Sequence, residues 1–270
     1  MRQFVASSPL SSDGTLRVTD KDFRYLKQVL RIQNGDMLAV RLPDGSLCNM
    51  TAAQVDASCR TVTLQLCAKG ETSGARFISE HGAKSEKNGV SFYLFQFIAK
   101  PQKMDLIIRQ ATECGVELIV PVIGEYCEKG AVSACRASSA KAERWQRIIR
   151  EALSQCGSAT NTRVAEPMSV QDAASFWKSE GGGIALSLYE RNEKTVSLHK
   201  ALSAYSGERI CLAVGAEGGI SPSEIETLSQ AGFSTIHFST NILRCETAAL
   251  YGIASVQSAL SEKDLWQFKE

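Results

Sequence analysis

The sequence predicts an α/β protein: a C-terminal domain with a mostly parallel sheet covered by helices, preceded by a small β-rich domain. From residue 90 to residue 270, apolar strand-like runs alternate with amphipathic helical segments. Residues 1–69 instead hold short runs of β-forming residues and a single helical stretch. Between them, residues 70–89 are rich in glycine, serine and charge, which is typical of a linker. We therefore expect two domains joined by this segment.

The first 69 residues are expected to form a small barrel with one helix. Ala39–Leu42 and Thr61–Leu66 are runs of β-forming residues, and Pro43–Ser46 is a turn signal that closes a hairpin. Apolar residues recur at helical spacing between Asp20 and Leu30, with cations off that stripe, so a short amphipathic helix is predicted there.

The C-terminal domain is predicted to alternate strands and helices along its whole length. Ser221, Pro222 and Glu224 form the start signal of one helix, because serine caps the first turn and glutamate three residues later completes a capping box. The other expected elements are strands over Val90–Ile98, Val116–Val122, Ile184–Tyr189, Ile210–Val214 and Thr235–Phe238, and helices over Pro101–Cys114, Ala140–Gly157, Leu198–Tyr205 and from Ile242 onward.

The composition is typical of a globular protein without a membrane span, a disulfide framework or a metal site. An apolar content of 44% and a net charge of +1 describe an ordinary globular chain, and a balanced total still leaves room for a local basic face. No segment has the pattern of a signal peptide or a membrane span, and the nine cysteines lack a CxxC pair. We expect reduced thiols in a cytoplasmic protein. His81, His199 and His237 lie far apart in sequence, so no metal site is expected.

The most informative stretch holds two short loops, each placed between a strand and a helix. The first loop, Gly215–Gly219, has closely spaced glycines that let a ligand approach the backbone, although a plain tight turn would look the same. Its spacing is not GxGxxG, and no Lys-Ser or Lys-Thr pair follows, which excludes the usual dinucleotide and phosphate loops. The second loop, Ser239–Leu243, should lie beside it, because carboxyl ends of parallel strands share one sheet edge.

Charged residues follow the second loop in an otherwise apolar segment. Arg244 and Glu246 stand at the expected helix start, where an unpaired charge is costly to bury. Glu246 is favoured there by the helix dipole, so a simple salt bridge at the helix start is one interpretation. Glu217 or Glu246 is the expected partner of Arg244.

A basic ridge is predicted on the helix of residues 140–157, where Lys141, Arg144, Arg147 and Arg150 repeat every three residues. Such a face is either solvated or bound to a phosphate backbone. Cations of the N-terminal domain are open to the same two interpretations, RNA contact or a solubilising surface. The candidate RNA-binding residues are Arg24, Lys27, Arg31, Lys100, Lys103, Arg144, Arg147 and Arg150.

In order and spacing, these motifs resemble the RsmE-type 16S ribosomal RNA (uracil-N3)-methyltransferases of the SPOUT, or trefoil-knot, superfamily. The motifs that carry the resemblance are GAEGGISPSEIE (215–226) and NILRCETAAL (241–250). Three further segments support it: KPQKMDLIIRQATECGVELIVP (100–121), RWQRIIREALSQC (144–156) and YLKQVLRIQNGD (25–36).

The resemblance implies a PUA-like N-terminal barrel that binds RNA, a knotted C-terminal domain, S-adenosylmethionine (SAM) as cofactor, and a homodimer. The expected reaction is methylation of uridine N3 in 16S ribosomal RNA of the small subunit. Arg244 and Glu246 are implied to be catalytic, with Arg244 stabilising the negative charge that develops on the uracil oxygens. The proton acceptor stays open between Glu246, Glu217 and water. The implied cofactor-binding residues are Leu186, Leu188, Gly215, Glu217, Gly218, Gly219, Ser239, Asn241, Ile242, Leu243 and Thr247.

The chain departs from the family pattern at a few positions. Ala216 stands where the family usually has proline, Asn241 and Gln110 where it has basic residues, and Tyr25 where it often has histidine. Three alternatives are another SPOUT RNA methyltransferase acting on ribose 2′-oxygen or on tRNA guanine, a non-catalytic RNA-binding assembly factor, and an α/β nucleotide-binding enzyme unrelated to RNA. The absence of phosphate-loop chemistry disfavours the last.

Overall fold

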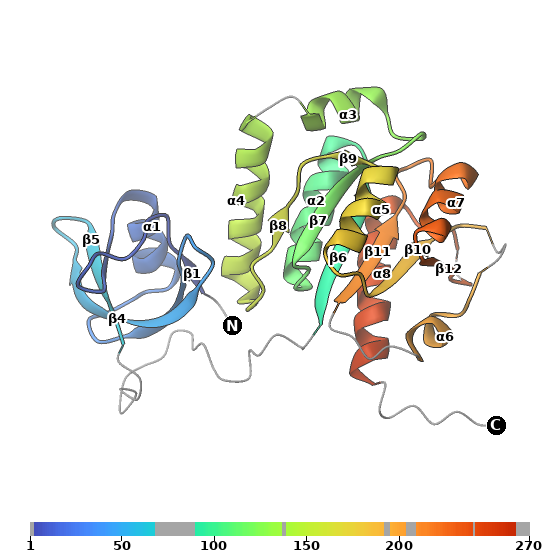
Figure 1. Cartoon of the computed structure of the whole chain (residues 1–270). Coiled ribbons are helices and arrows are strands. Elements are labelled where there is room, and N and C mark those ends of the chain that lie inside the picture. The colour runs from blue at the N-terminus through green and yellow to red at the C-terminus, as the bar shows by residue number, and fades with distance from the viewer. Residues whose placement is uncertain are drawn as a thin grey trace. The chain divides into compact units, whose positions relative to one another are not determined.

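The computed structural model describes residues 3–67, 90–136, 139–191, 195–203, 209–239 and 241–262 (Figure 1). The chain divides into two compact units, each with its own sheet. The N-terminal unit comprises Met1–Glu86 and Arg150–Asn161, and the C-terminal unit comprises Lys87–Ile149 and Thr162–Glu270. The linker predicted over residues 70–89 lies outside the described residues.

The N-terminal unit is built on a five-stranded sheet in the order β1-β3-β4-β5-β2. Strands β3 and β4 pair antiparallel across the turn at Pro43–Ser46, so the predicted hairpin is confirmed. Within the described residues β1 and β2 remain the two edges, so the sheet is a half-barrel. The strands are β1 (Phe4–Val5), β2 (Thr15–Val18), β3 (Met37–Arg41), β4 (Leu47–Asp56) and β5 (Thr61–Leu66).

One helical segment packs against this half-barrel, as predicted. It begins as α1 (Asp20–Arg24) and continues as a π-helical turn, η1 (Tyr25–Val29). Phe23 and Leu26 are buried in the same apolar cluster as the strand residues, which explains the helical spacing of the apolar residues in this stretch.

The C-terminal unit contains a seven-stranded sheet in the order β12-β10-β11-β6-β7-β8, with β9 also paired to β7. Its described pairings are all parallel, which confirms the predicted α/β class. The central strands are almost entirely apolar and buried, as expected for strands covered on both faces. The strands are β6 (Ser91–Phe97), β7 (Leu118–Ile123), β8 (Arg163–Val164), β9 (Met168–Ser169), β10 (Ile184–Leu188), β11 (Arg209–Val214) and β12 (Phe233–Ile236).

Helices cover both faces of this sheet (Figure 1). Helix α2 (Pro101–Glu113) connects β6 to β7, and α7 (Pro222–Gln230) connects β11 to β12 in the opposite direction along the sheet. Right-handed crossovers therefore place them on opposite faces. The last helix, α8 (Cys245–Ser261), packs on α2, and α5 (Val170–Ser179) packs on α7. The remaining helices are α3 (Lys129–Arg136), α4 (Ser139–Cys156) and α6 (Leu198–Ser203).

Two helices were absent from the sequence prediction, and one strand is displaced. Helix α5 has a usable signal, because Ser169 accepts a hydrogen bond from the Asp172 backbone N–H at 3.1 Å as an N-cap. Helix α3 is the second helix that was not predicted. The strand predicted over Thr235–Phe238 instead ends at Ile236, where its pairing with β10 stops. The last helix begins at Cys245 rather than Ile242.

None of the helices in the described part of the chain is both long and apolar enough to cross a membrane. All nine cysteines carry free thiols. The described residues contain no cluster of three or more side chains suited to hold a metal ion.

The predicted capping box at the start of α7 is confirmed, and it reaches beyond its own helix. The Glu224 carboxylate accepts hydrogen bonds from the backbone N–H of Ser221 at 2.9 Å and of Glu125 at 2.7 Å. A Cβ on Gly124 would lie 2.4 Å from Phe97, so the segment that carries Glu125 approaches β6 closely. One buried carboxylate thus fixes both the α7 start and the loop after β7.

We predict that Glu224→Ala lowers the free energy of unfolding by about 2–3 kcal/mol, because two backbone donors lose a charged acceptor. Glu226→Ala is the matched control, since Glu226 lies exposed on the same helix and should change stability by less than about 0.5 kcal/mol. Urea denaturation measures both variants. Equal stabilities for the two would contradict the bridging role of Glu224.

Candidate functional site

A cavity of about 390 Å³ lies at the carboxyl ends of three neighbouring strands, β12, β10 and β11. The segments that follow these strands form its walls, together with the start of α8 and one residue of α2. This is the crevice that the two strand-to-helix loops predict. Its lining residues are Lys103, Leu188, Tyr189, Glu190, Val214, Gly215, Ala216, Glu217, Gly218, Gly219, Ile236, His237, Phe238, Asn241, Ile242, Leu243, Arg244, Cys245 and Ala248.

The first loop is a tight turn that tolerates no side chain at two positions. Gly219 N–H donates to Ala216 O at 3.0 Å, and a Cβ on Gly215 would lie 2.6 Å from the Gly219 carbonyl carbon. Gly219 itself has φ +81°, in the region that favours glycine, and a Cβ there would lie 3.1 Å from Glu190 Oε2. The turn itself therefore requires glycine at both positions, and its residues line the cavity.

A buried side chain of β6 holds the beginning of this loop. Gln96 is fully buried, and its Nε2 donates to Val214 O at 3.3 Å, to Gly215 O at 3.2 Å and to Phe97 O at 2.9 Å. Two of these carbonyls, those of Val214 and Gly215, stand where β11 ends. Gln96 satisfies them and so fixes where the loop leaves the sheet.

The second loop leads into α8, and its side chains are largely exposed. Ile242 is 87% exposed. Arg244 occupies the N-cap position of α8 and is also exposed, and it forms no ion pair with the residues that the structure describes. The predicted pairing of Arg244 with Glu217 or Glu246 is therefore wrong. Both carboxylates pair with Lys103 instead.

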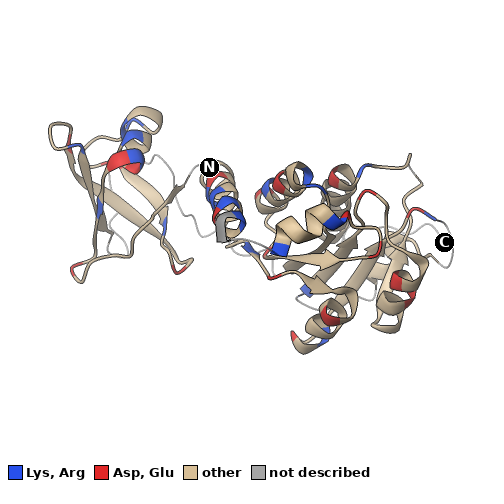
Figure 2. Cartoon of the chain, turned by 90° about the horizontal axis from the view of Figure 1, so that it is seen from above, with Lys and Arg blue, Asp and Glu red and all other residues tan. Residues whose placement is uncertain are grey.

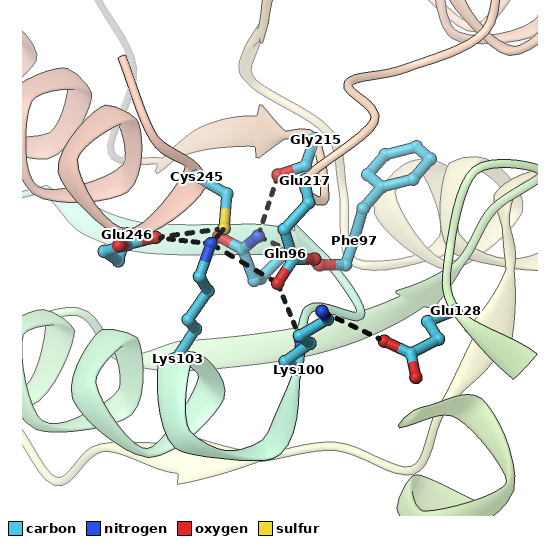
Figure 3. Close-up of polar contacts among 9 residues, drawn as sticks. All are labelled: Gln96, Phe97, Lys100, Lys103, Glu128, Gly215, Glu217, Cys245 and Glu246. Atoms are coloured by element: carbon cyan, nitrogen blue, oxygen red, sulfur yellow. Dashed lines mark hydrogen bonds and ion pairs between the residues drawn. The ribbon is translucent and has the colours of Figure 1, made fainter. Parts of the chain in front are cut away.

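Lys103 joins the first loop to the start of α8 (Figure 3). Its Nζ lies 3.4 Å from Glu217 Oε1 and 3.3 Å from Glu246 Oε2. The Cys245 thiol donates to Glu246 Oε2 at 3.3 Å, and the Lys100 backbone N–H donates to Glu217 Oε1 at 3.1 Å. The two glutamates are thus held by one ammonium group at the edge of the cavity.

These contacts move the pKa values of the cluster apart. Burial is the largest influence on Cys245 and, with the neighbouring glutamates, raises the pKa of its thiol to about 12, so the thiol stays protonated. Burial also raises the pKa of Glu246, but hydrogen bonds from its backbone, from Cys245 and from Lys103 outweigh that effect and lower it. For Lys103, burial lowers the pKa, and the surrounding acidic groups more than offset it.

The predicted cofactor and catalytic residues gather at this cavity with four exceptions. Leu186 is fully buried within β10, and Ser239, Glu246 and Thr247 stand beside the wall without lining it. His237 and Phe238, which follow β12, were not predicted to line the cavity, because the strand was predicted to run through them; a strand that ends at Ile236 would have placed both in the loop. Further lining residues without a predicted role are Glu190, Val214, Ile236, Cys245 and Ala248.

Of the candidate RNA-binding cations, all but Lys103 are exposed, and basic positions recur along α4 (Figure 2). Arg144 is the one whose guanidinium is paired within the C-terminal unit: its Nε donates to Asp105 Oδ2 at 2.8 Å, and its Nη2 contacts the same atom. Trp145 Nε1 donates to the other oxygen of Asp105 at 3.2 Å. These contacts dock α4 on α2.

Comparison with known proteins identifies close relatives. The model of the RNA methyltransferase domain family matches residues 86–257. Ribosomal RNA small subunit methyltransferase E 2 of Borreliella burgdorferi is 27% identical over 97% of this chain and 99% of the relative. The methyltransferase E of Buchnera aphidicola subsp. Schizaphis graminum is 30% identical over 64% of this chain and 68% of the relative.

Solved structures agree with these relatives. The crystal structure of a ribosomal RNA small subunit methyltransferase E from Neisseria gonorrhoeae, bound to S-adenosyl methionine, has a TM-score of 0.73 and 25% sequence identity. The match covers 96% of this chain and 97% of that one. The matched region therefore includes both units of the chain.

We predict that Gly215→Ala destabilises the C-terminal unit by about 1–3 kcal/mol, because the added methyl group meets rigid backbone. Gly130→Ala is the control: Gly130 lies in α3, its nearest neighbour would be 3.7 Å away, and alanine favours helix, so stability should rise or stay constant. Thermal unfolding compares the two. A Gly215→Ala variant as stable as the parent would show that the loop can open to accept a side chain.

Proposed function

The chain belongs to the RNA methyltransferase family, with the ribosomal RNA small subunit methyltransferases E as relatives, and we propose that it methylates 16S ribosomal RNA. In this proposal the methyl donor is SAM and the acceptor is N3 of a uridine. One observation carries it: the GAEGG motif (215–219) and the NILRC part of the second motif (241–245) line the same cavity.

The cavity is suited to SAM in size and in lining. Ligand pockets of small molecules have volumes of roughly 300–1,000 Å³, and this one has about 390 Å³. When bound, SAM supplies an electrophilic methyl group on a sulfonium. The bare backbone of Gly215–Gly219 would contact the cofactor on one side and Asn241–Leu243 on another, with Leu188 as a third wall. We keep Leu186, Ser239 and Thr247 as supporting positions around these walls.

Arg244 is proposed to act on the uracil. Loss of the N3 proton spreads negative charge onto the two flanking carbonyl oxygens, and a guanidinium can donate hydrogen bonds to either. Arg244 lines the cavity and is exposed, so its charge is available to a substrate. N3 is on the pairing edge of the base, so the uridine must be unpaired or extruded to reach this position.

The RNA itself is proposed to run over the exposed cations. Phosphate contacts position a nucleic acid without reading its sequence, and the repeated arginines of α4 with Arg24, Lys27 and Arg31 of the N-terminal unit offer such contacts. We propose that this unit is a PUA-like RNA-binding barrel. We also propose that the C-terminal unit has the trefoil knot of its superfamily. The return of α8 from the edge of the sheet to α2 and β11 supports this topology.

We further propose a cytoplasmic homodimer. Leu106 on α2 and Tyr251 on α8 are large exposed side chains on two helices that pack together, and Ile242 precedes α8. Exposed apolar side chains near one another often mark a protein interface. A second copy seated there would cover them beside the cavity.

The function is tested by incubating the protein with SAM and small-subunit RNA, free or in assembled particles, and identifying the product nucleoside by mass spectrometry. We expect N3-methyluridine. A 2′-O-methylated nucleoside or methylguanosine would assign the chain to another RNA methyltransferase activity. SAM binding without any product, or no SAM binding in calorimetry, would favour a non-catalytic assembly factor.

We predict that Arg244→Ala lowers kcat by about 10²–10³-fold, the usual effect of removing one donor that stabilises developing charge, while SAM affinity changes little. Arg163→Ala is the control, because Arg163 is exposed on β8, at the sheet edge far from the cavity. Calorimetry measures SAM binding, and methyl incorporation measures turnover. A parallel loss of both would mean that Arg244 serves the cofactor rather than the uracil.

A further inference from the structure

We infer that Lys103 is a positioning residue for methyl transfer: by pairing with Glu217 and Glu246 it holds the first loop of the cavity against the start of α8, directly after the second loop. The inference rests on the proposed function of the same site. It replaces the prediction from sequence that Lys103 contacts RNA phosphates. The contacts in Figure 3 carry it.

Lys103 occupies a place where a cation is costly. It lies in the first turn of α2, which contains no acidic residue, and the positive end of a helix dipole repels an ammonium group. Glu246 stands in the first turn of α8, where the dipole favours a carboxylate. The ion pair between them offsets the unfavourable position of Lys103 and brings two helix starts together.

The same ammonium also reaches the first loop. Glu217 follows Gly215 and Ala216 in the tight turn, and the Lys100 backbone N–H holds its carboxylate as well. The α2 start, the glycine loop and the α8 start therefore meet at one point. The side chains of Lys103, Glu217 and Glu246 are 28%, 29% and 15% exposed, so solvent screens these pairs less than pairs on the surface.

The same contacts also set the charge state of Glu246, one of the candidate acceptors of the N3 proton. The groups that face Glu246 are the Lys103 ammonium from α2 and the Cys245 thiol from its own helix, with Glu217 on the other side of the ammonium. A carboxylate that accepts from both is held in its charged form and is a weak base. Glu246 is thus held as a charged partner of Lys103, and Glu217 is held by the same ammonium group and by the Lys100 backbone N–H.

The test compares Lys103→Met, Lys103→Arg and the control Lys178→Met, an exposed lysine of α5 outside the site. We expect Lys103→Met to lower kcat by about 10–100-fold, since small misplacements of reacting groups have effects of that size, with KM for RNA changed less than about twofold. Arginine keeps the charge and should restore most of kcat. Lys178→Met should match the parent.

The pH profile gives a second reading that loss of packing alone would not change. In the parent, the pair with Lys103 breaks as the pH falls through the lowered pKa of Glu246; Lys103→Met has already lost that pair, so this acidic limb of kcat should flatten. A double variant with Glu217→Gln should lose less activity than the product of the two single losses, because both changes break one contact.

Several outcomes would overturn the inference. If Lys103→Met raises KM for RNA with kcat unchanged, Lys103 is a phosphate contact. If its kcat and acidic limb equal those of the parent, it has no positioning role. Failure of Lys103→Arg to fold better or react faster than Lys103→Met would also reject it. If the parent chain methylates no RNA, the proposed function itself is overturned. The comparison of variants with an active parent tests only the role of Lys103, so the two failures are distinguishable.

Discussion

The parallel register of β12, β10 and β11 is the constraint on which the site depends. Leu188 pairs with Ile236, and Ser187 pairs with Ala213 one position before β11 ends at Val214. The three strands therefore stop at the same level, and the loops after them leave the sheet side by side. A shift of one strand by a single residue would turn its side chains to the other face and separate the loops.

Around this edge, buried polar side chains hold the backbone where the strands end. Gln96 takes the carbonyls at the end of β11, and Glu224 takes amides at the start of α7 and after β7. An amide can donate to carbonyls and a carboxylate can accept from N–H groups, so each residue type matches the groups it meets. These side chains thus hold the loops from the side of the sheet, and the opposite side of the loops lines the cavity.

Much of this arrangement is predictable from local sequence patterns. Strand and helix alternation gave the parallel sheet, and Ser221 with Glu224 gave the capped start of α7, because both depend on neighbours in sequence. The charge pairing of the site depends on contacts between distant segments, and there local reasoning failed. Arg244 and Glu246 are two residues apart and looked like partners, yet Glu246 pairs with Lys103 from α2. Arg144, expected on a basic ridge, docks against Asp105.

The N-terminal unit is discontinuous in sequence, since it includes Arg150–Asn161. That short segment supplies hydrogen bonds that the unit needs: Leu153 O accepts from Gln3 at 2.9 Å, Ser154 Oγ contacts Tyr25 OH at 2.8 Å, and Ser158 O accepts from Arg41 at 2.6 Å. A fragment ending before residue 90 would lack these acceptors: the buried Gln3 side chain would lose its partner, and Arg41 would keep only its bond to Gly45 O. The chain passes between its two units three times, so a protease cut within residues 68–89 would separate residues 1–67 from Arg150–Asn161, which stays covalently joined to the C-terminal unit. Neither unit is therefore a separable module that evolution or an experimenter could exchange at the linker alone.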